Sequence, residues 1–114
     1  MKYALLIYSD EAAWQNASEE TKQRVYAGHA KLGEELQKRK AQVTGYELAP
    51  QREAKTAKLG DSPAVTDGPF AEAKESLGGF YVVECAGMDE ALALAKMIPA
   101  VATTSIEVRP VLEQ

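Results

Sequence analysis

The sequence predicts an α+β fold in which two helices cover one face of an antiparallel sheet. Segments with strand or helix patterns follow one another in the order strand, long helix, two or three strands, helix, strand. The helical segments carry apolar residues three and four positions apart, and the strand segments are rich in aromatic and β-branched residues. This order is that of the split βαβ, ferredoxin-like plan, and 114 residues fit one domain spanning residues 1–114.

Composition and charge exclude several classes of partner. The chain is 46% hydrophobic and 26% charged, as globular proteins are, and its net charge is −4. No basic run is longer than residues 38–40, so nucleic acid is not an expected partner. The apolar residues 1–8 are too few for a membrane span or a signal region. With Cys85 as the only cysteine, no internal disulfide can form, and we expect a cytoplasmic protein without a membrane partner.

The first strand and the first long helix are predicted from the N-terminal third. Residues 3–8 are continuously apolar and predict a central strand, and residues 9–11 cap a short helical turn that carries Trp14. Residues 18–40 predict one helix, with acidic residues in its first turn and basic residues in its last. One face of this helix carries Val25, His29, Leu32 and Leu36. That face should meet the sheet, so His29 should point inward.

The middle of the chain predicts a strand followed by a hairpin and a corner. Residues 42–48 predict a strand, and residues 54–59 and 63–66 predict a hairpin around Gly60-Asp61. Residues 67–70 (DGPF) combine residues that favour a stiff, exposed turn, in which Asp67 can bond its own downstream backbone. Residues 71–77 fit either a helical turn or an extended loop.

The last third predicts a strand, a helix and a strand. The glycine pair at residues 78–79 should end any preceding helix, and residues 80–85 form the clearest strand in the chain. A helix from Asp89 to Ile98 should stop at Pro99, and residues 105–112 predict a last strand whose proline favours an edge. Several strands are apolar on both sides, so we expect the uncovered sheet face to be buried in a homodimer.

The sequence resembles the DGPF-type branch of the YCII-related family over essentially its whole length. The resemblance lies in residues 65–72 (VTDGPFAE), 74–75 (KE), 77–80 (LGGF) and 106–110 (IEVRP), together with the opening residues. It implies a ferredoxin-like fold of the dimeric α/β-barrel type. It also implies a lyase-type enzyme that uses a histidine and an aspartate as a catalytic pair on small lactone-type compounds.

The resemblance assigns the histidine of the pair to His29, whose ordinary pKa suits proton transfer. Related sequences place the aspartate on the same helix, where this chain has Lys38, so Asp67 is the expected replacement. A core role for His29 and an Asx-turn role for Asp67 are the structural alternatives. The expected substrate-binding residues are Arg109, Lys74, Glu72 and Tyr8, whose alternatives are solvated ion pairs and, for Tyr8, simple packing.

No cofactor or metal site is expected, because one histidine and one cysteine cannot form a closed zinc set and no nucleotide-binding glycine motif follows a strand. The leading hypothesis is proton abstraction or elimination on a small anionic organic ligand by His29, with Asp67 orienting it. The alternatives are a ligand-binding or regulatory accessory module without catalysis and a purely structural dimer.

Overall fold

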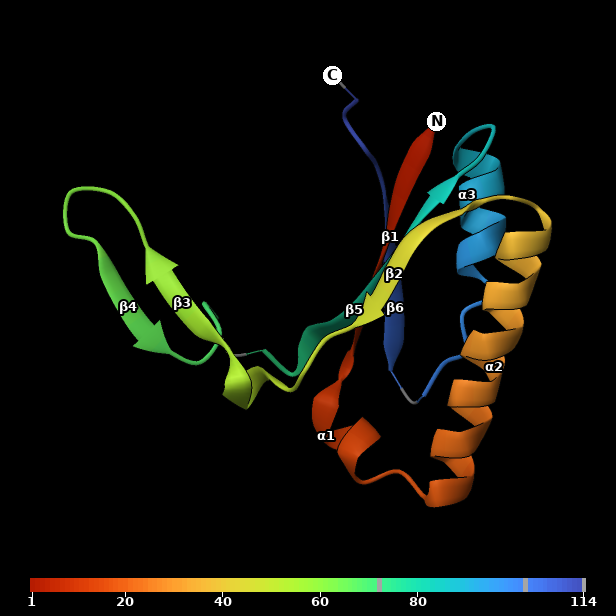
Figure 1. Cartoon of the computed structure of the whole chain (residues 1–114). Coiled ribbons are helices and arrows are strands. Elements are labelled where there is room, and N and C mark those ends of the chain that lie inside the picture. Colours follow the sequence, from red (N-terminus) through yellow and green to blue (C-terminus); the bar gives the residue numbers. More distant parts are fainter. Residues whose placement is uncertain (72, 102, 114) are drawn as a thin grey trace.

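A computed structural model describes residues 1–71, 73–101 and 103–113, and it shows the predicted α+β fold (Figure 1). Four strands form an antiparallel sheet in the order β2-β5-β1-β6. These strands are β1 (Lys2–Asp10), β2 (Gln42–Glu47), β5 (Glu75–Glu84) and β6 (Thr104–Pro110). The central positions of β1 and β5 and the edge position of β6 are as predicted.

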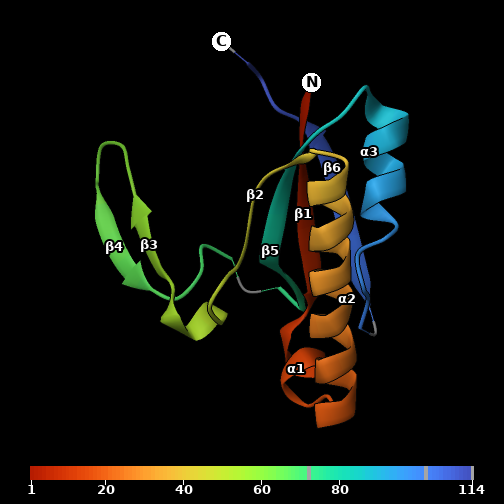
Figure 2. The same ribbon diagram turned by 45° about the vertical axis from the view of Figure 1, so that its right-hand side comes forward.

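Two helices, α2 (Glu19–Lys38) and α3 (Met88–Ala95), cover one face of this sheet and leave the other open (Figure 2). A short helix α1 (Glu11–Gln15) follows β1, and a 3-10 turn η1 (Gln51–Glu53) follows β2. The helices begin where the sequence predicted, because Asp10 and Ser18 accept hydrogen bonds from Ala13 N and Thr21 N at 3.2 and 3.1 Å. Within the described ranges, no helix is long and apolar enough to traverse a lipid bilayer.

The core lies between the sheet and the two longer helices. The largest fully buried side chains come from both layers and are Leu5, Val83, Leu36 and Leu94. Each such burial stabilises the fold by about 1.5–3 kcal/mol. Val25 and Leu32 are also buried, so the predicted inward face of α2 is confirmed. Cys85 is a buried free thiol, as expected.

Two boundary predictions were wrong. Gly78 and Gly79 do not precede the strand but lie within β5, which already begins at Glu75. The β1–β5 register shifts between Ile7 and Tyr8, whose partners are Gly79 and Leu77, so the glycine pair accommodates a bulge. Helix α3 ends at Ala95, three residues before the predicted end at Ile98.

The hairpin predicted in the middle of the chain forms a separate two-stranded sheet of β3 (Lys55–Lys58) and β4 (Ala64–Asp67). We call residues 55–67 the arm. The arm projects from the body on the side of the open sheet face (Figures 1 and 2). The radius of gyration is 15.7 Å, larger than the roughly 13 Å typical of a compact chain of this length, because the arm stands away from the core.

Candidate functional site

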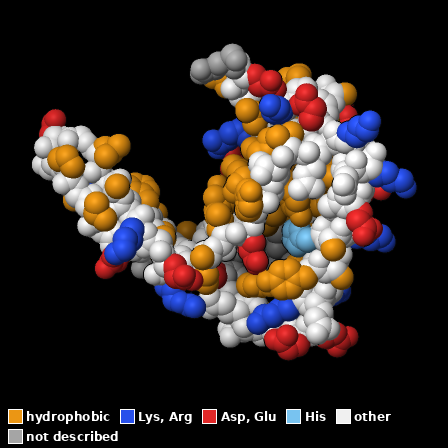
Figure 3. All heavy atoms as spheres, viewed as in Figure 1, with side chains coloured by type: hydrophobic (Ala, Val, Ile, Leu, Met, Phe, Trp, Pro, Cys, Tyr) orange, Lys and Arg blue, Asp and Glu red, His pale blue; other side chains and the backbone are white. Residues whose placement is uncertain are grey.

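A pocket of about 770 Å³ opens between α2 and the β2–β5 side of the sheet. The volume falls within the range of about 300–1,000 Å³ typical of small-molecule sites. Its lining includes Trp14 of α1, Tyr26 and His29 of α2, Gly45 and Glu47 of β2, and Tyr81 of β5. The histidine is visible in a hollow of the molecular surface, with acidic and hydrophobic side chains around it (Figure 3).

His29 and Tyr81 form the polar centre of this pocket. The His29 Nδ1 atom lies 2.7 Å from the Tyr81 Oη atom, and the two rings are stacked with an interplanar angle of 22°. The helical stripe that buries Leu32 also turns His29 toward the sheet, and alternation along β5 places Tyr81 on the same face as buried Val83. The predicted inward orientation of His29 is therefore confirmed, but the ring is half-buried at a pocket and is not sealed in the core.

Burial shifts the protonation of both groups toward their neutral forms. Desolvation lowers the pKa of His29 from its ordinary value of 6.5, and the negative charge of Glu47 partly opposes this. Desolvation also raises the pKa of Tyr81. At pH 7 the pair is therefore a neutral imidazole hydrogen-bonded to a neutral phenol.

The bond to Tyr81 leaves the second ring nitrogen of His29 available for chemistry. Among the described residues, no protein group forms a hydrogen bond with Nε2. When Nδ1–H donates to the phenol oxygen, Nε2 carries a lone pair and can accept a proton. When the phenol donates to Nδ1, Nε2–H is a donor. The neutral pair can therefore offer a substrate a base or a hydrogen-bond donor, depending on which partner donates.

Gly45 makes room for the tyrosine that holds His29. A Cβ atom at position 45 would lie 2.8 Å from Cδ1 and 3.2 Å from Cε1 of Tyr81. Real Cβ atoms do not approach ring atoms this closely, so a larger residue would displace the Tyr81 ring. Gly45 thus contributes to the site without providing a functional group.

Trp14, Tyr26 and Glu47 line the pocket and are joined to one another by side-chain contacts. The Trp14 and Tyr26 rings meet edge to face with centroids 5.5 Å apart, which joins α1 to α2. The Tyr26 hydroxyl donates to the Glu47 carboxylate at 3.3–3.4 Å, which joins α2 to the end of β2. Desolvation, followed by the charge and hydrogen bond of Glu47, raises the pKa of Tyr26.

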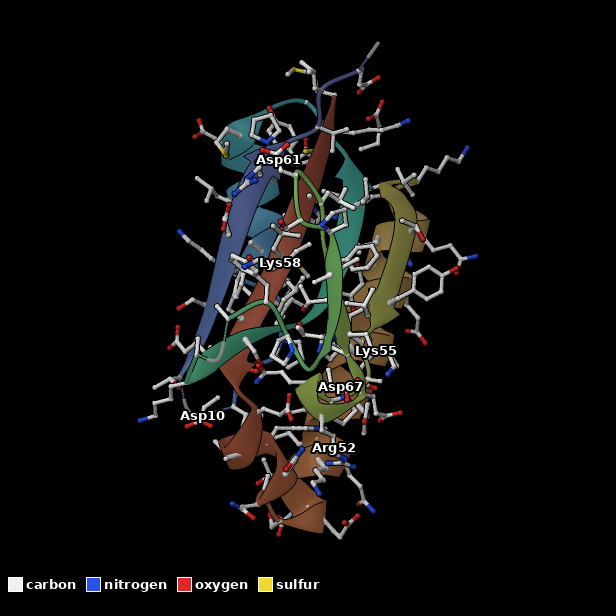
Figure 4. All side chains as sticks on the ribbon, turned by 90° about the vertical axis from the view of Figure 1, so that its left-hand side faces the viewer. Asp10, Arg52, Lys55, Lys58, Asp61 and Asp67 are labelled. Carbon is white, nitrogen blue, oxygen red and sulfur yellow. The ribbon has the colours of Figure 1, made fainter. Side chains whose placement is uncertain are left out.

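Asp67, predicted to orient His29, lies on the arm and is not in the pocket lining. Its carboxylate forms an ion pair with Lys55 Nζ at 2.7 Å across the β3–β4 pair, and both side chains are exposed. Figure 4 shows Asp67 and Lys55 together at the base of the arm. Within one chain, the structure does not bring Asp67 to His29, whose hydrogen-bond partner is Tyr81.

The corner after Asp67 has a turn geometry that differs in detail from the expected one. Gly68 has a φ of +90°, the left-handed conformation that glycine favours. Its N–H donates to Ala54 O at 2.7 Å, and Phe70 is 82% exposed. The corner is exposed as predicted, but the described part of the chain shows Asp67 bonded to Lys55 and not to its own downstream backbone.

The other predicted ligand contacts also lie outside the His29 pocket. Arg109 is exposed on the edge strand β6 and pairs with Glu107, with its Nε atom 2.8 Å from the carboxylate. Lys74 lines a shallower hollow, which shares Glu11 and Gln15 with the His29 pocket. Tyr8 is half-buried on β1 and does not line the pocket.

Glu72, also predicted to contact substrate, lies outside the described residues. Among those that are described, no group of three or more histidine, cysteine, aspartate or glutamate side chains could hold a metal ion.

Residues 1–114 match the YCII-related domain. The chain belongs to the YCII-related family. It is 37% identical to an uncharacterised protein of Rhizobium meliloti (strain 1021) over 123 aligned residues, which cover 96% of this chain and 91% of the relative. The name of this relative states no activity.

Sequence reasoning found His29 but missed Tyr81, Glu47, Tyr26 and Gly45. The period-2 pattern of β5 places residue 81 on the covered face, but no sequence signal tells which helical residue lies opposite it. Glu47 and Tyr26 are separated by 21 positions and meet only because α2 and β2 are packed side by side.

The pH dependence of stability should report on His29. Because burial lowers the pKa of His29, the folded protein binds a proton there less readily than the unfolded chain. Its contribution to the free energy of unfolding should be fully present above pH 6.5 and be lost as pH falls from 6.5 through the folded-state pKa. His29 is the only histidine, so His29→Gln should remove this slope. Urea unfolding at a series of pH values measures it, and equal slopes in both proteins would contradict the assignment.

Substitution of Gly45 by alanine should disturb the His29–Tyr81 pair. Overpacking against the Tyr81 ring should lower the free energy of unfolding by about 1–3 kcal/mol and shift the His29 imidazole signals in NMR spectra. Gly78→Ala is the matched control in the neighbouring strand, because a Cβ there meets nothing within 4 Å. Equal responses of the two variants would show that Gly45 makes no specific room for Tyr81.

Proposed function

We propose that this YCII-related protein is a small proton-transfer enzyme of the lyase type, with His29 as its catalytic residue. The observation that carries the proposal is the neutral His29 ring, whose Nδ1 is engaged by Tyr81 while its Nε2 is unengaged by the described protein at a pocket. A neutral imidazole held in one orientation is the arrangement that general base catalysis needs.

The proposed step is abstraction of a proton beside a carbonyl group. Nε2 of His29 takes the proton, so the imidazole becomes imidazolium and the substrate becomes an enolate. In an elimination, the enolate electrons form a double bond and expel a leaving group from the adjacent carbon. The imidazolium then returns its proton to the leaving group or to water. Tyr81 holds the ring orientation throughout.

Two cations of the pocket can hold an anionic substrate in place of the predicted Arg109 and Lys74. Arg52 of η1 and Lys22 of α2 both line the pocket. Arg52 is exposed and forms no ion pair within 4 Å among the described residues, and Figure 4 places it toward the end of the molecule where α1 lies. A guanidinium group can bind a substrate carboxylate with two parallel hydrogen bonds.

We also propose the branch of the family to which the protein belongs and the cellular compartment in which it acts. The residues VTDGPF at 65–70 support the DGPF-type branch of the family. A single buried cysteine and no disulfide among the described residues are compatible with the reducing cytoplasm that we propose as the place of action. The Asp67 of that motif is not part of the proposed chemistry.

Loss of proton abstraction in a His29 variant tests the proposed function. A panel of small keto acids and lactones in D₂O should reveal hydrogen exchange or elimination by ¹H NMR. His29→Gln should lower the rate by about 10²–10⁴-fold, the usual contribution of a general base. Tyr81→Phe should cause a smaller loss, and Asp67→Asn should match wild type. Exchange at the wild-type rate in His29→Gln would refute the catalytic role, and ligand binding without any exchange would favour a non-catalytic binding module.

We also propose that the protein acts as a homodimer in which the open sheet face is buried against a second copy. Alternation along the strands places Leu6, Phe80 and Val82 on this face, and Tyr46 is 68% exposed beside Phe80. Hydrophobic side chains line the side of the body that faces the arm (Figure 3). An isolated two-stranded hairpin is marginally stable in water, so the arm also gains from a packing partner.

If the open face is the dimer interface, a charged residue placed on it should dissociate the dimer. Light scattering at micromolar concentration should give about twice the chain mass for wild type, and Val82→Asp should reduce it to one chain by placing a charge in the interface. Leu92→Asp is the control, because Leu92 is 41% exposed on α3 and lies away from the open face. A monomeric wild-type mass would disprove the dimer.

A further inference from the structure

The His29 pocket is lined by two carboxylates, Glu11 and Glu47, and neither forms an ion pair with a cation within the described residues. The titratable or charged side chains that line the pocket with His29 are Glu11 of α1, Lys22 and Tyr26 of α2, Tyr46 and Glu47 of β2, Arg52 of η1 and Tyr81 of β5. These side chains differ in the number and strength of the hydrogen bonds that they already form. A carboxylate with few partners is the one that can interact with a positive charge on His29.

Glu11 and Lys22 are engaged near α1. The two oxygens of Glu11 accept hydrogen bonds from Gln15 Nε2 at 3.1 Å and from Gln51 N at 3.0 Å. Lys22 Nζ donates to Gln15 O at 3.3 Å. These contacts tie α1 to α2 and η1.

Glu47 has no comparable partners. Within the described residues its carboxylate accepts only the Tyr26 hydroxyl, through long bonds of 3.3–3.4 Å, and no lysine or arginine lies within 4 Å. Tyr26 is in turn fixed by the edge-to-face contact with Trp14. The carboxylate is thus held in the pocket lining by an uncharged hydroxyl group and not by a cation.

We propose that Glu47, held by Tyr26, is the carboxylate that acts with His29, as a positioning residue that stabilises the imidazolium formed when Nε2 takes a proton. This inference rests on the proposed function and deepens it. It gives Glu47 the electrostatic role that the sequence pattern had assigned to Asp67.

The electrostatics of the pocket support this role. The charge of Glu47 raises the pKa of His29 against the desolvation that lowers it. Without Glu47, burial alone would act on the ring, and His29 would be a weaker base. Because Glu47 is exposed, salt should screen part of the interaction.

Titration of the single histidine by NMR tests the inference and needs no substrate. In Glu47→Gln the midpoint of the His29 imidazole titration should fall below that of wild type, and the difference should shrink in 1 M salt, where the Debye length is about 3 Å. Glu47→Asp, which keeps the charge, should restore the midpoint toward wild type. Asp67→Asn is the matched control and should titrate as wild type.

Two results would overturn the inference. One is a wild-type midpoint in Glu47→Gln, and the other is a fall in Asp67→Asn as large as that in Glu47→Gln. Either result leaves the exchange assay with His29→Gln as a separate test, so failure of the Glu47 role and failure of the proton-transfer function can be told apart.

Discussion

The burial of one sheet face beneath α2 and α3 is the constraint on which the rest of the structure depends. Leu5 and Val83 of the central strands meet Leu36 and Leu94 of the helices, and none of these four side chains has measurable contact with solvent. This packing fixes the rotation of α2 about its axis. The same rotation turns His29 toward β5, so the core that stabilises the fold also assembles the candidate site.

The candidate site is partly buried, whereas the DGPF corner is exposed to solvent. The His29–Tyr81 bond lies in a half-buried pocket, where desolvation shifts the pKa of both partners toward the neutral forms. The Asp67–Lys55 pair is exposed on the arm, where an ion pair contributes at most about 1 kcal/mol. Perturbed titration beside a cavity is the more informative signal of chemistry, and it directs attention from the conspicuous motif to α2 and β5.

The arm and the open sheet face are two surfaces with exposed hydrophobic side chains, and both lie on the same side of the molecule. The arm strands pack chiefly on each other, and Val65 on β4 remains 70% exposed. The open face carries the aromatic pair Tyr46–Phe80 with ring centroids 6.2 Å apart. Both features follow from a fold in which all the helices of the main layer cover one face. The proposed assembly surface lies on the sheet face opposite to Tyr81, and its residues Tyr46 and Phe80 also line the pocket.

The sequence by itself determined the element order, the inward stripe of α2, the helix caps at Asp10 and Ser18, and the candidacy of His29, because these depend on local periodicity and short-range hydrogen bonds. It misjudged Gly78-Gly79, because a glycine pair can end a helix or accommodate a bulge, and only pairing with β1 selects between them. The partners of His29 were decided by tertiary structure alone. Tyr81 lies 52 positions away along the chain, and its contact depends on how a helix packs across a strand, which no local pattern encodes.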